Sequence, residues 1–418
     1  MNYNDLIVGL DIGSTKVSAV IGEINEQGIL EITGIGSSPS TGLKKGIVVN
    51  IEATLRSVIS AIEEAEMMSG QEVKSCWVGI GGSHIEGISS RGVVAVTGRN
   101  SGVREIGKDD VERVMEAARA VVIPMDRQIL EVIPQHFIVD DQRGIRDPMG
   151  MIGVRLEAEV HIITCSGTGA QNIAKCVQRA RFGVNDLILQ SLASARSVLT
   201  ADEKELGVVL IDLGGGTTDI LVYSEGAPYS TATIAAGGTQ VTNDISILKN
   251  ITFETAEKIK LEAGCCWEPF LEGDDDIIIP GVGGRAPLAF PRSQVLSIIR
   301  PRMEEIFKMI REKLDKLSLP RPLGGGVVIT GGGAQLLGAA ELASEIFNLP
   351  VRLGAPLPIG GLEEEYRNPA YATAVGLVLE AYEREKKKII VHGGEDRGRD
   401  SGESIVGKLL DWFKKEFF

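Results

Sequence analysis

The clearest pattern along the chain is an apolar run, a glycine-rich turn and a second apolar run. It occurs at 208–221, where the first run leads into Asp212 and three glycines follow. A short apolar run bounded by such a turn is typical of a strand buried on both faces. The same pattern occurs at 6–21, with Asp11 in the place of Asp212. Two such hairpins, about two hundred residues apart, predict an internal repeat and two similar lobes facing each other.

A third glycine-rich element, 326–338, combines a buried strand, a glycine triplet and the start of a helix. Apolar periodicity predicts the remaining elements. One of them, a long charged helix around 292–314, is expected to be interrupted at Pro301. Strands are predicted at 5–10, 17–24, 30–37, 75–80, 93–97, 129–139, 155–164, 187–189, 218–224, 230–236 and 349–353, and helices at 52–69, 108–120, 169–182, from 190, from 237, at 252–263 and at 368–379.

The residue types in the two hairpin turns point to anion binding. Glycines lack a Cβ atom, so their backbone N–H groups can approach a bound phosphate closely. Ser14 and Thr15 add hydroxyl groups, and Lys16 adds a cation. A carboxylate at the mouth of such a cradle usually serves a bound Mg²⁺, because this ion prefers carboxylate and water oxygens. For either motif alone, an ordinary hairpin with a glycine turn is the alternative.

These motifs resemble those of the actin, Hsp70 and sugar-kinase superfamily, whose members carry two phosphate motifs and then an adenosine motif. Along nearly its whole length the chain is similar to the FtsA family of bacterial cell-division proteins. The resemblance implies an α/β, actin-like (ribonuclease H-like) duplicated two-lobe ATPase fold with an inserted α+β subdomain and a C-terminal amphipathic helix. The three motifs would comprise Asp11, Gly13, Ser14, Thr15 and Lys16, then Asp212, Gly214, Gly215, Gly216 and Thr217, and then Gly331, Gly332, Gly333 and Gln335.

The resemblance implies ATP and Mg²⁺ as cofactors and adds further site residues. Gln190 lies where the superfamily places the residue that orients the attacking water, although a polar helix start explains it equally well. Gly238 opens a helix at the site. On the next helix, Glu257 and either Lys258 or Lys260 would reach the ribose and base, unless they only form surface salt bridges. The implied catalytic group is Gln190, Asp212 and Asp11, with both aspartates holding the metal through water.

The resemblance also divides the chain into subdomains, including one at 83–165 that replaces subdomain 1B of actin. The implied boundaries are 1–82 for subdomain 1A, 83–165 for the inserted subdomain 1C, 166–204 for the return to 1A, 205–265 for 2A, 266–323 for 2B, 324–382 for the return to 2A and 1A, 383–403 for a flexible linker and 404–418 for a membrane-targeting helix. Subdomain 1C would bind other division proteins or the next protomer.

Composition narrows the range of partners and ligands. The net charge of −14 argues against nucleic acid as a partner. The five cysteines form no C-x-x-C pair and are expected to be buried and reduced. His84, His136 and His161 lie on different predicted elements without metal-ligand spacing, so we expect exposed or capping side chains there.

Two further segments carry predictions about partners. The outer face of the helix around Pro301 is basic, and by resemblance subdomain 2B, with Arg300 and Arg302, would hold the acidic C-terminal tail of the tubulin-like protein FtsZ. A solvated charged face is the alternative. The pattern at 404–418 predicts an amphipathic helix after a polar linker, with its apolar face formed by Ile405, Leu409, Trp412, Phe413 and Phe417. Such a helix is typical of a peripheral membrane anchor, and docking onto its own lobes or a partner is the alternative.

The sequence therefore predicts an ATP-binding, actin-like division protein that polymerises and anchors the FtsZ ring to the inner face of the cell membrane. It would be at most a slow ATPase, with the nucleotide acting mainly as a ligand for polymerisation. A scaffold similar to the pilus protein PilM is the first alternative, although it would lack the terminal helix. A sugar-kinase-type phosphotransferase that uses Asp212 as a base is the second, but no sugar-contacting cluster is evident in the first lobe.

Overall fold

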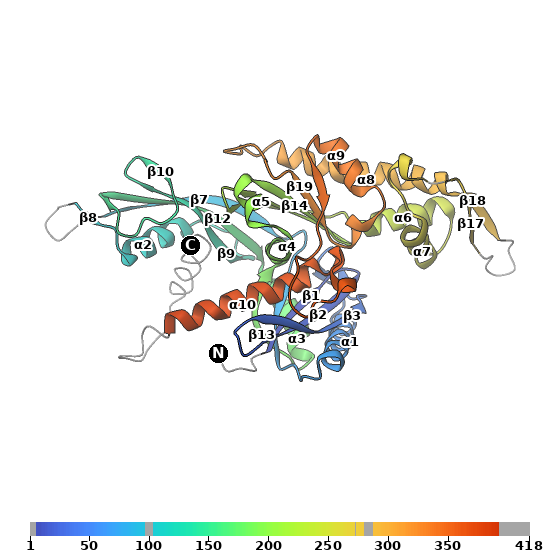
Figure 1. Cartoon of the computed structure of the whole chain (residues 1–418), viewed down its shortest axis with the longest axis horizontal. Coiled ribbons are helices and arrows are strands. Elements are labelled where there is room, and N and C mark those ends of the chain that lie inside the picture. Colours follow the sequence, from blue (N-terminus) through green and yellow to red (C-terminus); the bar gives the residue numbers. More distant parts are fainter. Residues whose placement is uncertain (1–5, 97–102, 272, 280–286, 393–418) are drawn as a thin grey trace.

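The computed structural model describes residues 6–96, 103–271, 273–279 and 287–392. Two lobes lie against each other, with an inserted domain at one end of the molecule and the outer part of lobe 2 at the other (Figure 1). The terminal helix predicted at 404–418 and most of the linker predicted before it lie outside the described residues.

Each lobe is built on a five-stranded sheet, and the two sheets have corresponding strand orders. In both, an antiparallel hairpin carries a phosphate motif, and the first hairpin strand also pairs with a parallel strand from later in the chain. In corresponding order, the strands are β3 (Leu30–Pro39), β2 (Lys16–Ile24), β1 (Leu6–Ile12), β6 (Ser75–Ile80) and β13 (Gly183–Leu189) in lobe 1, and β16 (Ala227–Ile234), β15 (Thr218–Ser224), β14 (Val208–Leu213), β19 (Val327–Thr330) and β20 (Val351–Leu353) in lobe 2. The predicted duplication is confirmed.

Two helices join the lobes. Helix α4 (Gln190–Val198) packs against strands of both sheets, and α10 (Ala372–His392) crosses it. A Cβ atom on Gly376 of α10 would overlap the Ala193 carbonyl oxygen of α4, so only glycine permits this close crossing.

The remaining helices cover the sheets. In lobe 1, Asn50 caps α1 by accepting a hydrogen bond from the Ala53 N–H, and Gly70 ends the helix in the left-handed region. The helices are α1 (Ile51–Ser69) and α3 (Gly167–Arg179) in lobe 1, and α5 (Ala201–Leu206), α6 (Gly238–Lys249), α7 (Phe253–Ala263), α8 (Arg292–Leu314) and α9 (Ala339–Phe347) in lobe 2.

Helix α8 is continuous, so the interruption predicted at Pro301 is wrong. Proline removes one backbone hydrogen bond, but buried residues on both sides of it, including Ile299 and Met303, pack into the core of lobe 2. This burial outweighs the local cost of the proline. The hairpin β17 (Asp276–Ile279) and β18 (Leu288–Pro291) lies beside α8 at the outer end of lobe 2 (Figure 1).

The inserted domain has a four-stranded sheet with α2 (Lys108–Arg119) on one face. It is inserted in lobe 1 between β6 and α3 and has an apolar core of its own between the sheet and α2. Its strands are β7 (Glu86–Ala95), β9 (Arg127–Val139), β10 (Gln142–Ile145) and β12 (Arg155–Ser166), with the small pair β8 (Arg104–Glu105) and β11 (Ile152–Gly153) beside them.

The second face of this sheet touches lobe 2, which the strand pattern did not predict. His161 of β12 is 2% exposed, and its Nε2 atom lies 2.9 Å from the Thr231 hydroxyl of β16. Gln135 donates a hydrogen bond to the Tyr229 carbonyl at 3.0 Å. The expectation of an exposed or capping role is therefore wrong for His161. Because side chains alternate along a strand, the His161 side chain lies on the face of the insert sheet that points away from the insert's core. Lobe 2 covers that face.

Helix α10 extends further than predicted. It ends at His392, so the first ten residues of the linker predicted at 383–403 are helical. The charged residues there are good helix formers, and Arg384 pairs with Glu380 one turn earlier. Among the described residues, no helix is long and apolar enough to cross a membrane.

Candidate nucleotide site between the lobes

The two phosphate hairpins have the same backbone geometry. In lobe 1 the Gly13 N–H donates to the Lys16 carbonyl at 2.9 Å, and in lobe 2 the Gly214 N–H donates to the Thr217 carbonyl at 3.0 Å. The strand registers also correspond, because Asp11 pairs with Ser18 and Asp212 pairs with Asp219. The same local sequence pattern has therefore produced the same turn twice.

The tips of the two hairpins touch where the two lobes meet, and we call this junction the cleft. A Cβ atom on Gly216 would lie 2.7 Å from the Ser14 hydroxyl, and one on Gly215 would overlap Thr15. The N-terminus of α6 supports the second hairpin, since the Gly238 N–H donates to the Gly214 carbonyl at 2.9 Å. A side chain at Gly215 or Gly216 would therefore collide with the first hairpin, so the absence of a Cβ atom permits this close approach.

Helices α4 and α10 position the two aspartates. Gln190, at the start of α4, donates a hydrogen bond to Asp11 at 2.6 Å. The Ser194 hydroxyl donates to Asp212 at 2.6 Å, and the Thr373 hydroxyl of α10 donates to the same oxygen at 3.1 Å. Gln190 therefore does lie inside the cleft. Ser194 and Thr373 have no sequence signal, because they meet Asp212 only where the two helices cross.

The carboxylates of the cleft carry perturbed pKa values. Burial, reinforced by the neighbouring Asp212 charge, raises the pKa of Asp11 to about 6. Burial raises the pKa of Asp212 as well, against the hydrogen bonds from Ser194 and Thr373. Burial also raises the pKa of Asp219 to about 7, although the Thr233 hydroxyl donates to it at 2.6 Å. Sequence reasoning missed Asp219, and the hairpin register opposite Asp212 was the signal that could have found it.

Lys16 is the cation of the first hairpin, and it points toward the adenosine motif. Its ammonium donates to the Ala370 carbonyl at 3.0 Å and lies 3.5 Å from the centre of the Tyr371 ring. Burial lowers its pKa to about 8, against the attraction of Asp11. The segment around Tyr371 therefore joins the first phosphate motif to the second lobe.

The adenosine motif follows β19 and packs against the second hairpin. Gly331 has a φ of 85°, and a Cβ atom there would overlap the Asp212 carboxylate. Gly332, Gly333 and Gln335 form a short 3₁₀ turn (Gly332–Gln335), and Asn368 donates to the Gln335 side chain at 2.9 Å. This close approach brings the three predicted motifs together in one cleft.

On α7, only one of the two candidate lysines points inward. The Lys260 ammonium lies 2.8 Å from Glu257 and 3.0 Å from the Thr242 hydroxyl, beside Gly238, and its side chain is 14% exposed. The Lys258 side chain is 72% exposed and pairs with Glu262. The fold therefore places Glu257 and Lys260 next to the cleft and Lys258 on the surface.

The donor set fits a hydrated magnesium nucleotide. No three His, Cys, Asp or Glu side chains of the described ranges are placed to bind one metal ion together. Mg²⁺ keeps several waters and needs only one or two carboxylates besides phosphate oxygens, so Asp11 and Asp212 suffice to hold it through water. The glycine-lined tips supply the amides that phosphate requires.

Arg300 and Arg302 lie on the outer side of α8, but they do not form a free basic surface. Arg300 pairs with Glu304 at 3.0 Å, and Arg302 pairs with Asp244 at 2.6 Å. Nearby, Lys308 also pairs with Glu304. Acids from the same helix and from α6 therefore compensate the basic face expected from the sequence.

Comparisons with known proteins agree with this geometry. A family model described as "Cell division protein FtsA" matches residues 209–376, and one described as "SHS2 domain inserted in FTSA" matches residues 82–164. The chain is 44% identical to a "Cell division protein FtsA" from Pseudomonas aeruginosa over 99% of its own length and 98% of the relative. It is 46% identical to the one from Borreliella burgdorferi, over 99% of both chains.

Solved structures with low sequence identity share the fold. A PilM–PilN type IV pilus biogenesis complex matches with a TM-score of 0.63 at 16% identity, covering 90% of this chain and 98% of that one. MreB 5 of Spiroplasma citri bound to AMPPNP matches with a TM-score of 0.55 at 15% identity, covering 93% and 98%. The fold is therefore actin-like, and the chain belongs to the FtsA family of cell division proteins.

Proposed function

We propose that this cell-division protein binds Mg-ATP between its lobes and uses the nucleotide to hold them in a state that polymerises. The observation that carries the proposal is the pair of mirrored hairpins, whose tips at Ser14 and Gly216 meet at the junction of the two lobes. One lobe alone offers half of such a cradle. A triphosphate gripped from both sides stabilises the closed arrangement, because it binds that arrangement better than an open one.

In this proposal, each group of site residues has a separate role in binding the nucleotide. The amides of both hairpins, with Ser14 and Thr15, bind the phosphates, and Lys16 adds charge. Asp11 and Asp212 hold the hydrated metal, which supplies charge neutralisation for the phosphates. Glu257, Lys260 and the turn at Gly331–Gln335 hold the adenosine. Gln190 is within hydrogen-bond distance of Asp11 and orients a water in any hydrolysis, which is at most slow.

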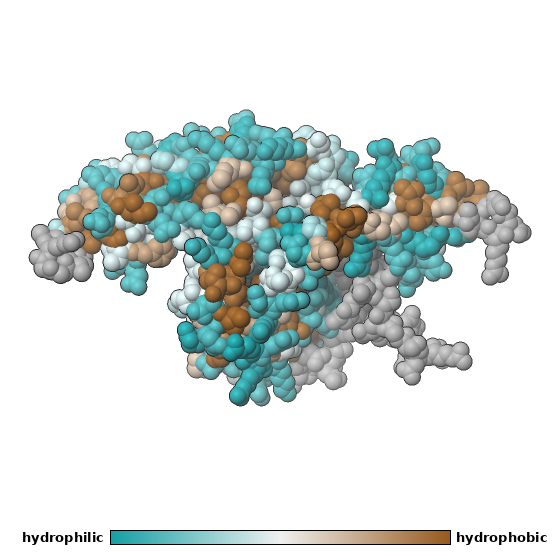
Figure 2. All heavy atoms as spheres, turned by 180° about the vertical axis from the view of Figure 1, so that it is seen from behind, coloured by the Kyte–Doolittle hydropathy of each residue, from teal (hydrophilic) through white to brown (hydrophobic). Residues whose placement is uncertain are grey.

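We further propose that the protein anchors the FtsZ ring to the inner face of the cell membrane. The membrane contact is assigned to residues 404–418, whose apolar residues recur at helical spacing. On the face of the globular part in Figure 2, apolar residues form separate patches among hydrophilic ones. On its sequence pattern, the terminal segment is the candidate for lipid binding. Subdomain 2B would hold the FtsZ tail, and subdomain 1C would meet other division proteins or the next protomer.

Calorimetry with Mg-ATP tests the nucleotide part. We expect wild-type protein to bind, and the Gly331→Ala variant to lose at least tenfold in affinity, because the methyl group would meet Asp212. Asp202→Asn, at an exposed acid on α5, is the matched control. Equal affinity in all three proteins, or no binding by the wild type, would overturn the proposal.

Sedimentation with vesicles tests the membrane part. Full-length protein should pellet with vesicles containing anionic lipid, carrying FtsZ with it, and protein truncated after residue 403 should stay in the supernatant while still binding FtsZ. Co-sedimentation of the truncated protein would reject the assignment of the anchor. The PilM-like scaffold and the sugar-kinase alternatives are not favoured, since the likeness to the PilM complex is one of fold alone.

A further inference from the structure

A short hairpin that no motif assignment includes closes one end of the cleft. Strands β4 (Leu43–Lys44) and β5 (Ile47–Val48) are joined by a two-residue turn. Both turn residues have positive φ, 53° at Lys45 and 77° at Gly46. Asn, Asp and Gly are the usual residues in such a turn, and lysine there is uncommon. An exposed lysine held in a costly backbone conformation is a reason to look for a function at that position.

The turn touches both phosphate hairpins. The Gly46 N–H donates to the Ser14 hydroxyl at 3.2 Å. A Cβ atom on Gly216 would lie 3.2 Å from the Lys45 nitrogen, so the turn also lies against the second hairpin. Its other side rests on the end of β6, where a Cβ atom on Gly82 would lie 3.0 Å from the Lys45 carbonyl. Lys45 and Gly46 together thus touch both hairpin tips and the end of β6.

Three acids lie near the turn, and Lys45 is the turn residue that carries a positive charge. Asp11, Asp212 and Asp219 lie in the cleft, and a bound triphosphate would add further negative charge. Lys16 directs its ammonium toward Ala370 and Tyr371, on the adenosine side. Within the part of the chain that the structure describes, no acid forms an ion pair with Lys45. The Lys45 side chain is exposed, and no acid of the described residues holds its charge beside the two hairpin tips.

We propose that Lys45 binds the terminal phosphate of a nucleoside triphosphate and so makes the site distinguish triphosphate from diphosphate. This inference rests on the proposed ATP binding and adds a residue to it. The turn places the lysine beside the tips of both hairpins, and we assign the last phosphate of a triphosphate to this position. A diphosphate lacks that group, so the charge of Lys45 would contribute little to its binding.

Calorimetric titration with Mg-ATP and with Mg-ADP tests the inference. Lys45→Asn removes the charge and keeps a residue that tolerates positive φ, and Lys45→Gln removes it with a longer side chain. In both variants we expect affinity for ATP to fall about tenfold and affinity for ADP to change less than twofold. Lys45→Arg should retain the wild-type ratio. Lys44→Gln, one residue earlier and also exposed, is the matched control and should retain it too.

The outcomes distinguish a failure of the proposed role of Lys45 from a failure of the proposed ATP binding. An unchanged ratio of ATP to ADP affinity in both charge-removing variants, or an equal loss in Lys44→Gln, would overturn the role of Lys45 while leaving ATP binding intact. Absence of ATP binding by the wild type would instead reject the proposed function. Melting temperatures within a few degrees of the wild type would show that the variants fold, and Lys45→Asn is the variant least expected to disturb the turn.

Discussion

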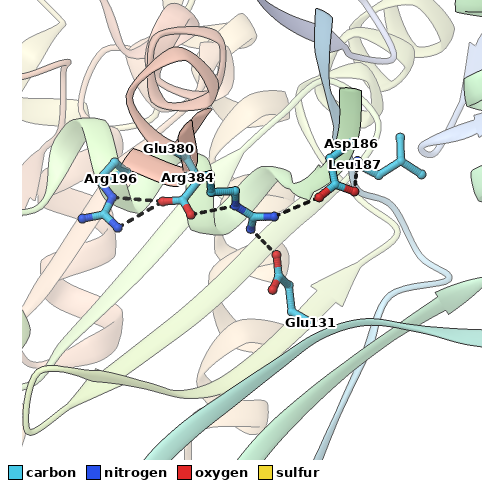
Figure 3. Close-up of polar contacts among 6 residues, drawn as sticks. All are labelled: Glu131, Asp186, Leu187, Arg196, Glu380 and Arg384. Carbon is cyan, nitrogen blue, oxygen red and sulfur yellow. Dashed lines mark hydrogen bonds and ion pairs between the residues drawn. The ribbon is translucent and has the colours of Figure 1, made fainter. Parts of the chain in front are cut away.

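Two clusters of acidic residues lie where separate parts of this molecule meet, and they differ in how their charge is balanced. The cleft cluster is Asp11, Asp212 and Asp219, between the phosphate hairpins. The α10 cluster joins the insert, lobe 1 and α10, as Figure 3 shows. It comprises Glu131, Asp186, Arg196, Glu380 and Arg384.

In the α10 cluster, arginines satisfy the acids. Arg384 pairs with Glu131, with Glu380 at 3.0 Å and with Asp186 at 3.3 Å (Figure 3). Arg196 pairs with Glu380 from the other side at 3.1 Å. Although burial alone would lower the pKa of Arg384, attraction to Glu131 and Glu380 raises it above the usual range.

In the cleft cluster, hydroxyl and amide groups contact the carboxylates, and Lys16 is the nearby cation. Burial raises the pKa values of Asp11 and Asp219 to about 6 and about 7, and it also raises the pKa of Glu131 in the α10 cluster, against the attraction of Arg384. Buried acids with matched cations hold domains together, whereas buried acids left short of cations mark a site that a ligand completes.

The largest effect is expected on removing the central cation of the α10 cluster. Arg384→Met leaves Glu131 and Glu380 buried without their main partner, so we expect the free energy of unfolding to fall by about 3–5 kcal/mol. Denaturant unfolding measures it. Arg321→Met, which breaks an exposed pair with Glu225, should cost less than about 1 kcal/mol. Equal losses in the two variants would mean that the α10 cluster is no stronger than a surface pair.

Removing a carboxylate from the cleft cluster should instead affect ligand binding. Asp212→Asn keeps the side-chain shape and removes a charge that repels Asp11. We expect affinity for Mg-ATP to fall about 10- to 100-fold, as for the loss of a residue that positions a metal. Thermal unfolding without nucleotide should show no loss of stability. A large loss of stability with unchanged affinity would place Asp212 with the structural acids.

The pH dependence of stability sharpens the contrast further. Because the pKa values of Asp11 and Asp219 rise from 3.8 in the unfolded chain to about 6 and about 7, the folded protein binds more protons between about pH 4 and pH 7. Their contribution to stability is therefore largest on the acid side and is lost as the pH rises through this window. As the pH rises from 5 to 8, we expect the free energy of unfolding of Asp219→Asn to gain about 1–2 kcal/mol relative to that of the wild type.

Urea unfolding at several pH values measures that difference. The exposed Asp202→Asn variant is the control and should follow the wild type throughout. A constant difference between Asp219→Asn and wild type across this range would show that Asp219 titrates at the same pH in the folded and unfolded states.

The smallest effect is expected at the adenosine end of the cleft. Lys260→Met removes an ammonium that lies beside Gly238 and Glu257, so affinity for Mg-ATP should fall about threefold to tenfold. Lys258→Met, at the surface position on the same helix, should bind as tightly as wild type. Titration of a fluorescent ATP analogue compares the two. The reverse order of effects would assign the contact to Lys258.

Much of the architecture was predictable because it depends on local pattern. The apolar runs around the Asp11 and Asp212 turns specified both hairpins, and their similarity specified the duplicated lobes. The pattern failed where distant contacts decide the outcome. Pro301 lies inside a continuous helix because its neighbours are buried, and His161 is buried because lobe 2 covers its face of the insert sheet.

In the site too, some residues were predictable from local pattern and others depend on distant contacts. Its glycines, Asp11 and Lys16 stood out by type and spacing, but Ser194 and Thr373 are ordinary helix residues until α4 and α10 cross at Asp212. Whether Lys258 or Lys260 points inward depended on how α7 packs beside α6. The partners of Arg300 and Arg302 could not be read from charge alone, since Asp244 comes from a different helix.

The two hairpins, their glycines and carboxylates, and the order of elements follow from local sequence, because turn chemistry and apolar periodicity act over a few neighbouring residues. Which acids are neutralised, and which are left for a ligand, depends on the packed fold. That outcome depends on arginines and hydroxyls supplied from far along the chain, and on the exclusion of water where the lobes and the insert pack together.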